Sequence, residues 1–387
     1  MILTPRYPYP VIGGDRLRIY YLCRELAQSF SLTLLSMCDC REELESPLPD
    51  DGVFDRIERV YLPKWRSYLN VILALPTSIP LQVAYYRNKY FASRLQLLLP
   101  EHEAVLAHLI RTGDYVQNVA KPRILEMTDA ISLNYCRLKQ SSVNKSLKSY
   151  VYTLEADRLL RYEKNILTKF DLVSLVSDTD RLFLVEGRSA NNVLVCSNGV
   201  DLRLFPFEPD YRYPVIVFIG NMTTLQNLDA CHYFIDEVMP LLLNLRPYIF
   251  RIVGKIQPKD AKRLSSFANV EVTGKVDDIS TAVKGASVAI CPMRIAAGVQ
   301  NKILEYMALG LPTVTSSIGF EGLEAQAGED LLIADEPAEY VMSIEKIIGN
   351  VDFAKNLARR ARLYVERDHS WESKIAPMTE RIHALLG

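Results

Sequence analysis

The sequence predicts two doubly wound α/β domains, because short apolar strands alternate with segments of helical period along most of the chain. These strands are rich in β-branched residues and apolar throughout, which is typical of parallel strands covered on both faces. They are expected at 31–37, 104–109, 122–127, 171–177, 192–199, 214–220, 248–254, 270–274, 287–292 and 312–317. The length of 387 residues exceeds one ordinary core and suits two domains of similar size.

Helical segments separate most of these strands, with clear examples at 17–30 and 228–245. The domain boundary is expected within 198–214, where three prolines follow a strand and a new strand–glycine–helix unit begins. Two such domains would place a ligand-binding cleft between the carboxyl edges of their sheets.

The composition of the chain argues against several classes of protein. The net charge is −1, which gives no general case for a nucleic-acid binder. The longest apolar run, 69–81, is short and contains two prolines, so no membrane span is expected, and the first residues lack a signal-peptide pattern. The seven scattered cysteines are expected to be reduced, mostly buried thiols of a cytoplasmic protein, without a structural zinc.

The stretch 293–317, MRIAAGVQNKILEYMALGLPTVTSS, carries the chemistry. A helix is expected from Gly298 to Leu309, ended by Gly310 and Pro312. Gly298, Asn301, Lys302 and Glu305 would share one face, while apolar residues occupy the others. The helix start and Lys302 favour an anion, and Glu305 suits sugar hydroxyls one turn deeper, which together describe a nucleotide sugar. The alternative is a surface Lys–Glu pair.

With these residues in place, nearly the whole chain resembles the retaining family-4 glycosyltransferases of the GT-B fold, within a bacterial subgroup tied to exopolysaccharides. The resemblance rests on several segments together: TPRYPYPVIGGDRLRIYYL, SIPLQVAYYRNKY, VLAHLIRTGDYV, LEMTDAISLNY, CSNGVDLRLF, FIGNMTTLQNLDA, RIVGK, VEVTGKVDDI and GVQNKILEYMALGLPTVTSSIGFEGLEA. It implies an N-terminal acceptor domain over 1–200, joined by a C-terminal helix at about 370–387, and a nucleotide-sugar donor domain over 201–369.

Two departures from the family pattern concern the donor. The broad family carries two glutamates on the donor helix; the second matches Glu305, but the first falls at Ala297. An Arg and a Lys that often contact the diphosphate are replaced by Asn221 and Gln226. Backbone amides, Arg294, Asn301 and Lys302 would then serve the donor.

The resemblance assigns roles to further residues. His108 ends a strand where the family often has a histidine near the transferred sugar; the alternative is a core histidine. Asp129 follows the expected strand 122–127 in a similar strand-end position, and from there it would orient or deprotonate the acceptor hydroxyl. The candidate catalytic residues are therefore His108, Asp129, Lys302 and Glu305. Candidate donor-binding residues are Gly13, Gly14, Asn221, Gly254, Lys275, Arg294, Gly298, Val299 and Asn301, and candidate acceptor-binding residues are Arg16 and Arg111. No metal or cofactor is expected, and the DxD of SDTDR (177–181) is interpreted as a helix N-cap at Ser177 or Asp178.

Residues 59–100 contain six bases, interleaved aromatic residues and no acid. The stretch forms either solvated helix faces or a surface for anionic lipid or an anionic acceptor. The latter would place the protein peripherally on the inner face of the plasma membrane.

The sequence thus predicts a metal-independent retaining glycosyltransferase. It would move a sugar from a UDP- or GDP-linked donor to a saccharide or lipid-linked saccharide in cell-surface polysaccharide or glycan synthesis. A catalytically degenerate nucleotide-sugar-binding partner of such an enzyme is the alternative that Ala297 keeps open, and a sugar-nucleotide epimerase is a third.

Overall fold

The chain forms two compact units, each built on its own sheet, in this computed structural model. Unit 1 comprises Met1–Ser197 and Trp371–Gly387, and unit 2 comprises Asn198–Ser370. The structure describes residues 1–11, 14–140, 147–185, 187, 190–207, 214–296 and 298–387. The chain therefore passes between the units twice, after Ser197 and after Ser370.

Unit 1 contains a seven-stranded parallel sheet in the order β3-β2-β1-β4-β5-β6-β7. Its strands are β1 (Ile2–Thr4), β2 (Thr33–Cys38), β3 (Arg56–Tyr61), β4 (Val105–His108), β5 (Arg123–Thr128), β6 (Leu172–Leu175) and β7 (Val193–Val195). The strand order reverses between β1 and β4, so the crossover helices after these two strands cover opposite faces of the sheet.

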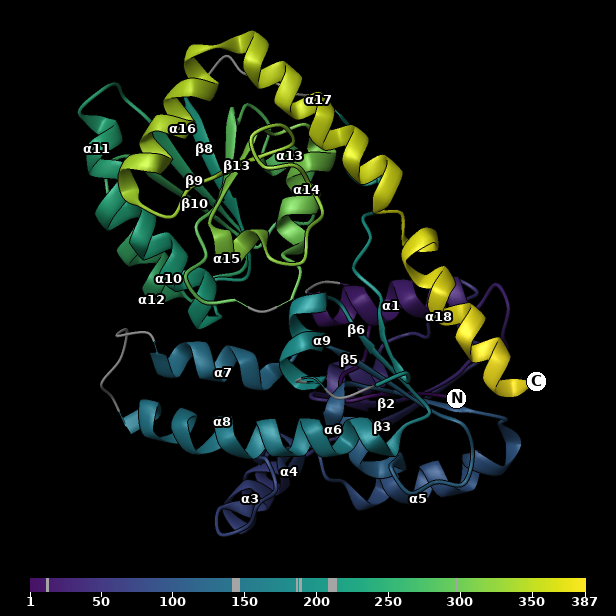
Figure 1. Cartoon of the computed structure of the whole chain (residues 1–387). Coiled ribbons are helices and arrows are strands. Elements are labelled where there is room, and N and C mark those ends of the chain that lie inside the picture. The colour runs from purple at the N-terminus through teal and green to yellow at the C-terminus, as the bar shows by residue number, and fades with distance from the viewer. Residues whose placement is uncertain (12–13, 141–146, 186, 188–189, 208–213, 297) are drawn as a thin grey trace. The chain divides into compact units, whose positions relative to one another are not determined.

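The helices of unit 1 follow its strands in a regular alternation (Figure 1). They are α1 (Gly14–Leu26), α2 (Arg41–Glu45), α3 (Lys64–Ala74), α4 (Leu81–Tyr85), α5 (Lys89–Leu98), η1 (Leu99–Glu101), α6 (Leu109–Val116), α7 (Ile131–Gln140), α8 (Leu147–Ile166), η2 (Leu167–Lys169), α9 (Asp178–Val185) and α18 (Trp371–Leu386).

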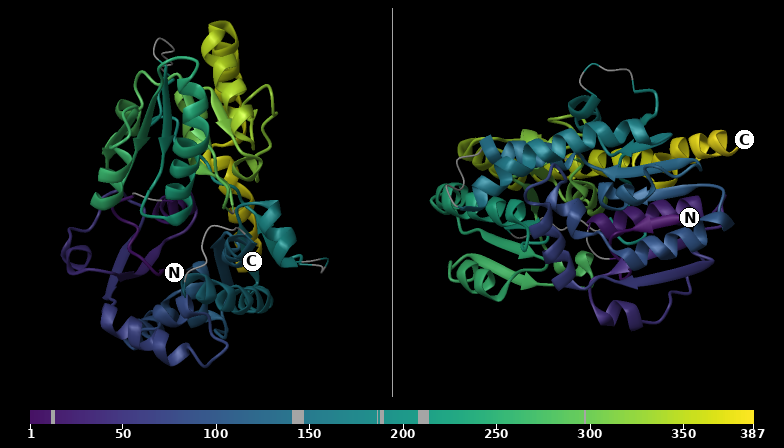
Figure 2. Two further views of the ribbon diagram at one scale, coloured as in Figure 1. Left: turned by 90° about the vertical axis from the view of Figure 1, so that its left-hand side faces the viewer. Right: turned by 90° about the horizontal axis from the view of Figure 1, so that it is seen from below.

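The last helix, α18, completes the core of unit 1 and lies beside α1 (Figures 1 and 2). Trp371 is buried and stacks on Tyr21 of α1, with ring centroids 4.8 Å apart. Ile375 and Met378 join the same apolar cluster. Unit 1 therefore needs the end of the chain to close its core.

Unit 2 contains a six-stranded parallel sheet in the order β10-β9-β8-β11-β12-β13. Its strands are β8 (Val215–Ile219), β9 (Ile249–Val253), β10 (Val270–Gly274), β11 (Val288–Cys291), β12 (Thr313–Thr315) and β13 (Leu332–Ile333). The order reverses between β8 and β11. In sheets of this kind, ligands bind outside the carboxyl ends of the strands at such a reversal.

Helices cover both sides of this sheet (Figure 1). They are α10 (Leu225–Tyr233), the π-helix η3 (Phe234–Val238), α11 (Met239–Leu243), α12 (Pro258–Leu264), α13 (Ile279–Ala282), α14 (Asn301–Leu309), α15 (Ser317–Phe320), α16 (Pro337–Gly349) and α17 (Val351–Asp368). One apolar cluster joins the strands to α10, α14, α16 and α17.

The predicted doubly wound α/β class is confirmed, and each of the ten expected strands is present within one or a few residues of its expected ends. The ten expected strands do not include β1, β3 or β13. Strand β3, RIERVY, is charged and only partly buried at the sheet edge, so it lacks the apolar pattern used to find the others. No described helix is long and apolar enough to cross a membrane.

Candidate functional site

At the carboxyl edge of the unit 2 sheet, three glycines allow neighbouring strands to end close together. Gly254 has φ +131°, and a Cβ there would overlap the carbonyl oxygen of Gly220. The N–H of Gly254 donates to the carbonyl oxygen of Gly274 at 3.0 Å, and that of Gly220 donates to Val253 at 2.9 Å. Gly254, a predicted donor-binding residue, is thus required by backbone geometry.

Helix α14 begins later than the sequence predicted. Gly298 lies before the helix with φ +67°, a left-handed conformation, and the helix starts at Asn301 after the N-cap residue Gln300. The expected helical face that included Gly298 was therefore wrong, because the backbone turns before the helix starts. Gly298 and Val299 are buried in this turn, and Ala297 lies outside the described residues. The predicted end at Gly310, with φ +75°, is confirmed.

Lys302 lies in the first turn of α14, and the partners of its ammonium group in the described part of the chain are uncharged. Its Nζ donates to Oδ1 of Asn227 at 2.5 Å, lies 3.7 Å from the sulfur of Met293, and is 4.3 Å from the ring centre of Phe218. Burial lowers the pKa of Lys302, although Cys291, Cys231 and Glu305 act in the opposite direction. A half-buried ammonium group without a hydrogen-bonded carboxylate is a ready partner for an anion.

Glu305 lies one turn further along α14 and is also half-buried. Burial raises its pKa to about 7, and the charge of Lys302 opposes that rise only in part. The described part of the chain provides Glu305 with no hydrogen bond and no ion pair, Lys302 included. The alternative of a surface Lys–Glu pair is therefore not what the structure shows, and the carboxylate is available to accept hydroxyl groups.

The second cation predicted for the donor, Arg294, is already neutralised. It makes two hydrogen bonds to Asp229, at 3.1 and 2.7 Å, and its guanidinium stacks on Tyr233 with a centroid distance of 4.8 Å. Asp229 raises the pKa of Arg294. The geometry gives Arg294 a structural partner, and its role toward a donor stays a prediction.

Asn221, Asn301 and Lys275 also border this edge. The side chain of Asn221 accepts hydrogen bonds from the N–H and hydroxyl of Thr223, at 3.1 and 2.7 Å, and so shapes the loop after β8. Asn301 accepts a hydrogen bond from Asn198 at 2.6 Å. Lys275 is exposed directly after β10. None of these contacts tests the predicted donor contacts, which remain predictions.

In unit 1, His108 belongs to a buried ionic cluster that the sequence analysis did not foresee. Its Nδ1 is 2.7 Å from Glu126, which also accepts a hydrogen bond from Arg18 at 3.2 Å and from the hydroxyl of Thr128 at 3.0 Å. Burial would raise the pKa of Glu126, but the hydrogen bond from His108 and the charge of Arg18 outweigh it and hold that pKa at about 2. Arg18 also donates to the carbonyl oxygen of Ser197 at 2.8 Å.

The other ring nitrogen of His108, Nε2, is buried and has no hydrogen-bond partner among the residues that the structure describes. The backbone beside it is unusual, because Leu109 and Thr128, which follow or end the neighbouring strands β4 and β5, both have φ +66°. Such conformations are costly for residues with a side chain and gather at functional sites. His108 therefore has one nitrogen fixed by Glu126 and one buried nitrogen without a hydrogen-bond partner in the described chain.

Asp129 lies next to a second group of buried carboxyl groups. Burial and the nearby charge of Asp180 raise the pKa of Asp129 to about 7. Burial also raises the pKa of Glu163 to about 8, although it accepts hydrogen bonds from Ser132. An acid with a pKa near 7 is suited to proton exchange, and the role of Asp129 toward an acceptor stays a prediction.

The DxD interpretation is confirmed at Ser177. Its hydroxyl oxygen accepts a hydrogen bond from the N–H of Asp180 at 3.1 Å, as an N-cap of α9 does, while Asp178 pairs with Arg181 at the surface. Among the residues that the structure describes, no group of three or more His, Cys, Asp or Glu could hold a metal ion. None of the seven cysteines forms a disulfide within the described chain, and five of them are buried.

The two arginines predicted for the acceptor have protein partners. Arg16 donates to Glu43 at 2.5 Å, and Arg111 donates to Gln82 at 3.0 Å and lies over the ring of Tyr86. Gly14 begins α1 and has open space around its Cα, whereas Gly13 lies outside the described residues.

Sequence reasoning missed Glu126, Arg18 and Asn227. The sequence pattern could have indicated Glu126 and Arg18, because each is a charged residue within an otherwise apolar strand or helix face. A charged residue in such a place needs a partner when it is buried. Asn227 carried no such signal, since an amide in a first helical turn has many uses.

Comparison of the sequence with known proteins finds one matching family model and one similar protein over nearly the whole chain. Residues 213–350 match the family model of group 1 glycosyl transferases. A protein of Klebsiella pneumoniae, described as an uncharacterized 44.6 kDa protein in the cps region, is 22% identical over 390 residues, covering 95% of this chain and 96% of the relative.

Two solved structures show the fold. Sucrose-phosphate synthase of Thermosynechococcus elongatus matches with a TM-score of 0.72 at 16% identity, covering 99% of this chain and 98% of that one. HepE of Anabaena, in complex with UDP and glucose, matches with a TM-score of 0.69 at 13% identity, covering 99% of both chains.

Two doubly wound units, each with one reversal of strand order, form the GT-B fold that these structures share. Within unit 2, residues 213–350 are similar to the group 1 glycosyl transferases.

Proposed function

We propose that this protein is a retaining glycosyltransferase. It transfers a sugar from a UDP- or GDP-linked donor to a saccharide or a lipid-linked saccharide in the synthesis of a cell-surface polysaccharide. The family match over unit 2 and the HepE structure with bound UDP and glucose support a nucleotide-sugar donor. The cps-region relative supports a role in surface polysaccharide.

The observation that carries the proposal is the pair of incompletely satisfied charges on α14. Among the described residues, no carboxylate is in hydrogen-bond contact with Lys302. This lysine lies in the first turn of a helix, where unsatisfied backbone N–H groups and the helix dipole add positive potential. A diphosphate is the anion that this arrangement suits. During transfer the bond between sugar and diphosphate breaks, and Lys302 stabilises the negative charge that develops on the leaving phosphate.

Glu305 supplies the second part of donor recognition. Its carboxylate lies one turn from Lys302 and has unused acceptor capacity within the described chain. Vicinal ribose hydroxyls are donors that match a carboxylate at this distance from a phosphate. A metal ion is not needed in this scheme, because Lys302 and the helix meet the phosphate charge.

On the acceptor side, we assign His108 to the transferred sugar and Asp129 to the acceptor hydroxyl. Within the described chain, the buried Nε2 of His108 has no hydrogen-bond partner, and in this proposal it bonds a hydroxyl of the sugar. Asp129, with a pKa of about 7, can take the proton that the acceptor hydroxyl loses as its oxygen bonds to the sugar.

Thermal-shift and calorimetric titration with UDP, GDP and their glucose and mannose conjugates tests the donor site. We expect one base to stabilise the wild-type protein and Glu305→Ala to lose that effect, while the surface variant Glu324→Ala keeps it. Equal stabilisation of wild type and Glu305→Ala would overturn the assignment of α14.

The degenerate binding protein remains the competing function, favoured by the neutralisation of Arg294 by Asp229. Nucleotide release from the bound donor separates the two, measured with saccharide and lipid-linked saccharide acceptors. Binding that depends on Glu305 without any release would support the binding protein. Release that Glu305→Ala abolishes would support the transferase.

A further inference from the structure

Helix α3 presents a broad apolar face to solvent. Only Ser67 and Ala74 of its residues are buried. Trp65 is 64% exposed, and Leu73 is 65% exposed. The α3 face consists of these exposed apolar residues, which continue just past the helix end: Trp65, Tyr68, Leu69, Ile72, Leu73 and Leu75. Contiguous apolar surface of this kind marks an interaction site.

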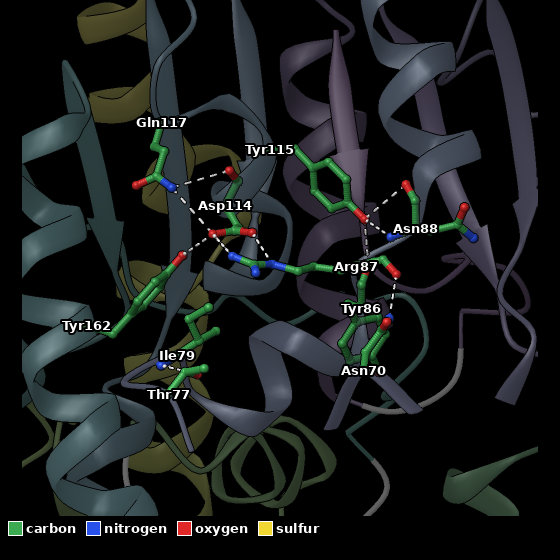
Figure 3. Close-up of polar contacts among 10 residues, drawn as sticks. All are labelled: Asn70, Thr77, Ile79, Tyr86, Arg87, Asn88, Asp114, Tyr115, Gln117 and Tyr162. Atoms are coloured by element: carbon green, nitrogen blue, oxygen red, sulfur yellow. Dashed lines mark hydrogen bonds and ion pairs between the residues drawn. The ribbon is translucent and has the colours of Figure 1, made fainter. Parts of the chain in front are cut away.

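A polar network fixes α3 to unit 1 from its other side (Figure 3). Asn70 of α3 donates to the carbonyl oxygen of Arg87 at 2.9 Å, and Arg87 makes two hydrogen bonds to Asp114, at 2.9 and 3.2 Å. The hydroxyl of Tyr115 donates to the carbonyl oxygen of Tyr86 at 2.7 Å. Because this side is satisfied by hydrogen bonds, the exposed apolar residues are held outward on a fixed support.

The charges around the α3 face are positive. Lys64 and Arg66 on α3, and Lys89 at the start of α5, form no ion pair with any residue that the structure describes, although Lys64 lies near enough to Asp39 to affect its pKa. Arg66 lies over the rings of Trp65 and Tyr90, 5.0 and 5.7 Å from their centres. Residues 59–100 contain no acid.

We propose that the α3 face docks on the surface of an anionic lipid bilayer. Tryptophan and tyrosine favour the headgroup level of a membrane, leucine and isoleucine favour the acyl boundary, and lysine and arginine bind anionic headgroups. The face offers these three kinds of side chain together. The inference rests on this face alone and does not depend on the proposed reaction.

Charge separates a bilayer from a second copy of the chain. A two-fold dimer through α3 would bring together two faces that each carry Lys64 and Arg66, without a carboxylate from 59–100 to offset these charges. An anionic lipid surface supplies the missing negative charge over the whole face.

The length of α3 fixes the mode of contact. Eleven residues extend for about 16 Å, which is about half the hydrocarbon thickness of a bilayer. The helix therefore lies in the plane of the interface, with its apolar residues inserted only to the depth of a side chain.

Tryptophan fluorescence gives a direct readout. Of the two tryptophans, Trp65 is exposed and Trp371 is 3% exposed within the unit 1 core. Adding phosphatidylglycerol–phosphatidylcholine vesicles at low salt should shift the emission to shorter wavelength, and lipid with brominated chains should quench it. Pure phosphatidylcholine vesicles should give a much weaker response, and Trp65→Phe should remove it.

Vesicle flotation of the full chain measures affinity. Leu69→Ser/Ile72→Ser should weaken binding about tenfold or more, because both side chains leave the apolar phase. Lys64→Gln/Arg66→Gln should weaken binding to anionic vesicles and reduce its salt dependence. The matched control is Met342→Ser/Leu363→Ser, two exposed apolar residues of unit 2, which should bind as wild type does.

Three results would overturn the proposal. They are wild-type protein that ignores anionic vesicles at low salt, unchanged binding by Leu69→Ser/Ile72→Ser, and a dimer in light scattering that this variant alone converts to monomer without any vesicle binding. The last result would assign the α3 face to self-association. Circular dichroism melts should coincide for all these surface variants, so that a loss of binding is not a loss of fold.

Discussion

The buried ionic cluster of unit 1 and the charges on α14 of unit 2 differ in how far the protein itself satisfies them. Glu126 accepts hydrogen bonds from Arg18 and Thr128 and lies within hydrogen-bond distance of His108. The side chains of Glu126, His108 and Arg18 are almost wholly buried. Lys302 has one amide partner, and Glu305 has none in the described chain. The first arrangement holds a side chain in place, whereas the second leaves binding energy for a ligand. Changes in unit 1 should therefore affect stability, and changes on α14 should affect affinity.

The largest effect is expected from Glu126→Ala. It leaves Arg18 as a buried charge with no carboxylate, which should lower the free energy of unfolding by about 3–5 kcal/mol in urea denaturation followed by circular dichroism. The control is Glu58→Ala, which removes a carboxylate that pairs with Arg56 and Arg94 at the surface and should cost about 1 kcal/mol or less. An equal decrease in the free energy of unfolding in the two variants would contradict the proposed difference between the buried pair and the exposed pair.

A pH-dependent effect is expected at Glu163. Its pKa is about 8 when folded and lies near 4.5 when unfolded, so the folded state binds the extra proton between these values. Stability is therefore greatest below about pH 4.5 with respect to this group and falls as pH rises toward 8. Glu163→Gln removes the titration.

The melting temperature of Glu163→Gln should accordingly rise relative to wild type from pH 5 to pH 8. Relative to wild type, the free energy of unfolding of the variant should increase by on the order of a few kcal/mol over this interval, and calorimetry at both pH values measures it. Glu58→Gln provides a control whose gap to wild type should not change between pH 5 and pH 8. The arginine partners lower the pKa of Glu58, so this group is ionised in both states over that interval. A gap between Glu163→Gln and wild type that does not change with pH would show that Glu163 ionises normally.

Lys302→Met tests the unsatisfied cation. Loss of a charge-assisted contact to phosphate should weaken nucleotide binding about 100-fold, while stability stays the same or increases because a partly buried charge is gone. Isothermal calorimetry and thermal melts measure both. Lys346→Met, which removes another ammonium lying over an aromatic ring, 4.2 Å from the centre of Phe353, should change neither affinity nor stability much.

The smallest effect is expected at Glu305. Its pKa of about 7 means that its carboxyl group is mostly protonated at pH 6 and mostly ionised at pH 8, and only the ionised group offers all its acceptor sites to ribose hydroxyls. Affinity for the preferred nucleotide sugar should rise severalfold, up to about tenfold, over this interval. A nucleotide-sugar diphosphate does not titrate there, so Glu305→Gln should flatten the profile. A profile that stays steep in Glu305→Gln would place the titrating group elsewhere.

Much of the architecture followed from the sequence because it depends on local patterns. Apolar runs such as 214–220 and 287–292 predict buried parallel strands, and Gly310 with Pro312 predicts the end of α14. The start of α14 could not be predicted in the same way, because Gly298 is compatible with a first helical turn and with the left-handed turn that the structure shows.

The candidate site was predictable where residues act alone and not where they act through partners. Lys302 and Glu305 stood out as polar residues on an apolar helix. The pairing of Arg294 with Asp229, and of Arg16 with Glu43, joins segments far apart in the chain, and no local spacing indicates it. The same holds for the pairing of Arg18 with Glu126, because it depends on how α1 packs against the strands.

The stacking of Trp371 on Tyr21 has a consequence for how the protein is made. On the ribosome, the first unit is synthesised early but cannot acquire its last helix until all of unit 2 has been translated. The nascent first unit would meanwhile expose the apolar surface around Tyr21, a state open to chaperones and to aggregation. A chain truncated before Trp371 should therefore have a unit 1 that depends on chaperones, whereas unit 2 should not.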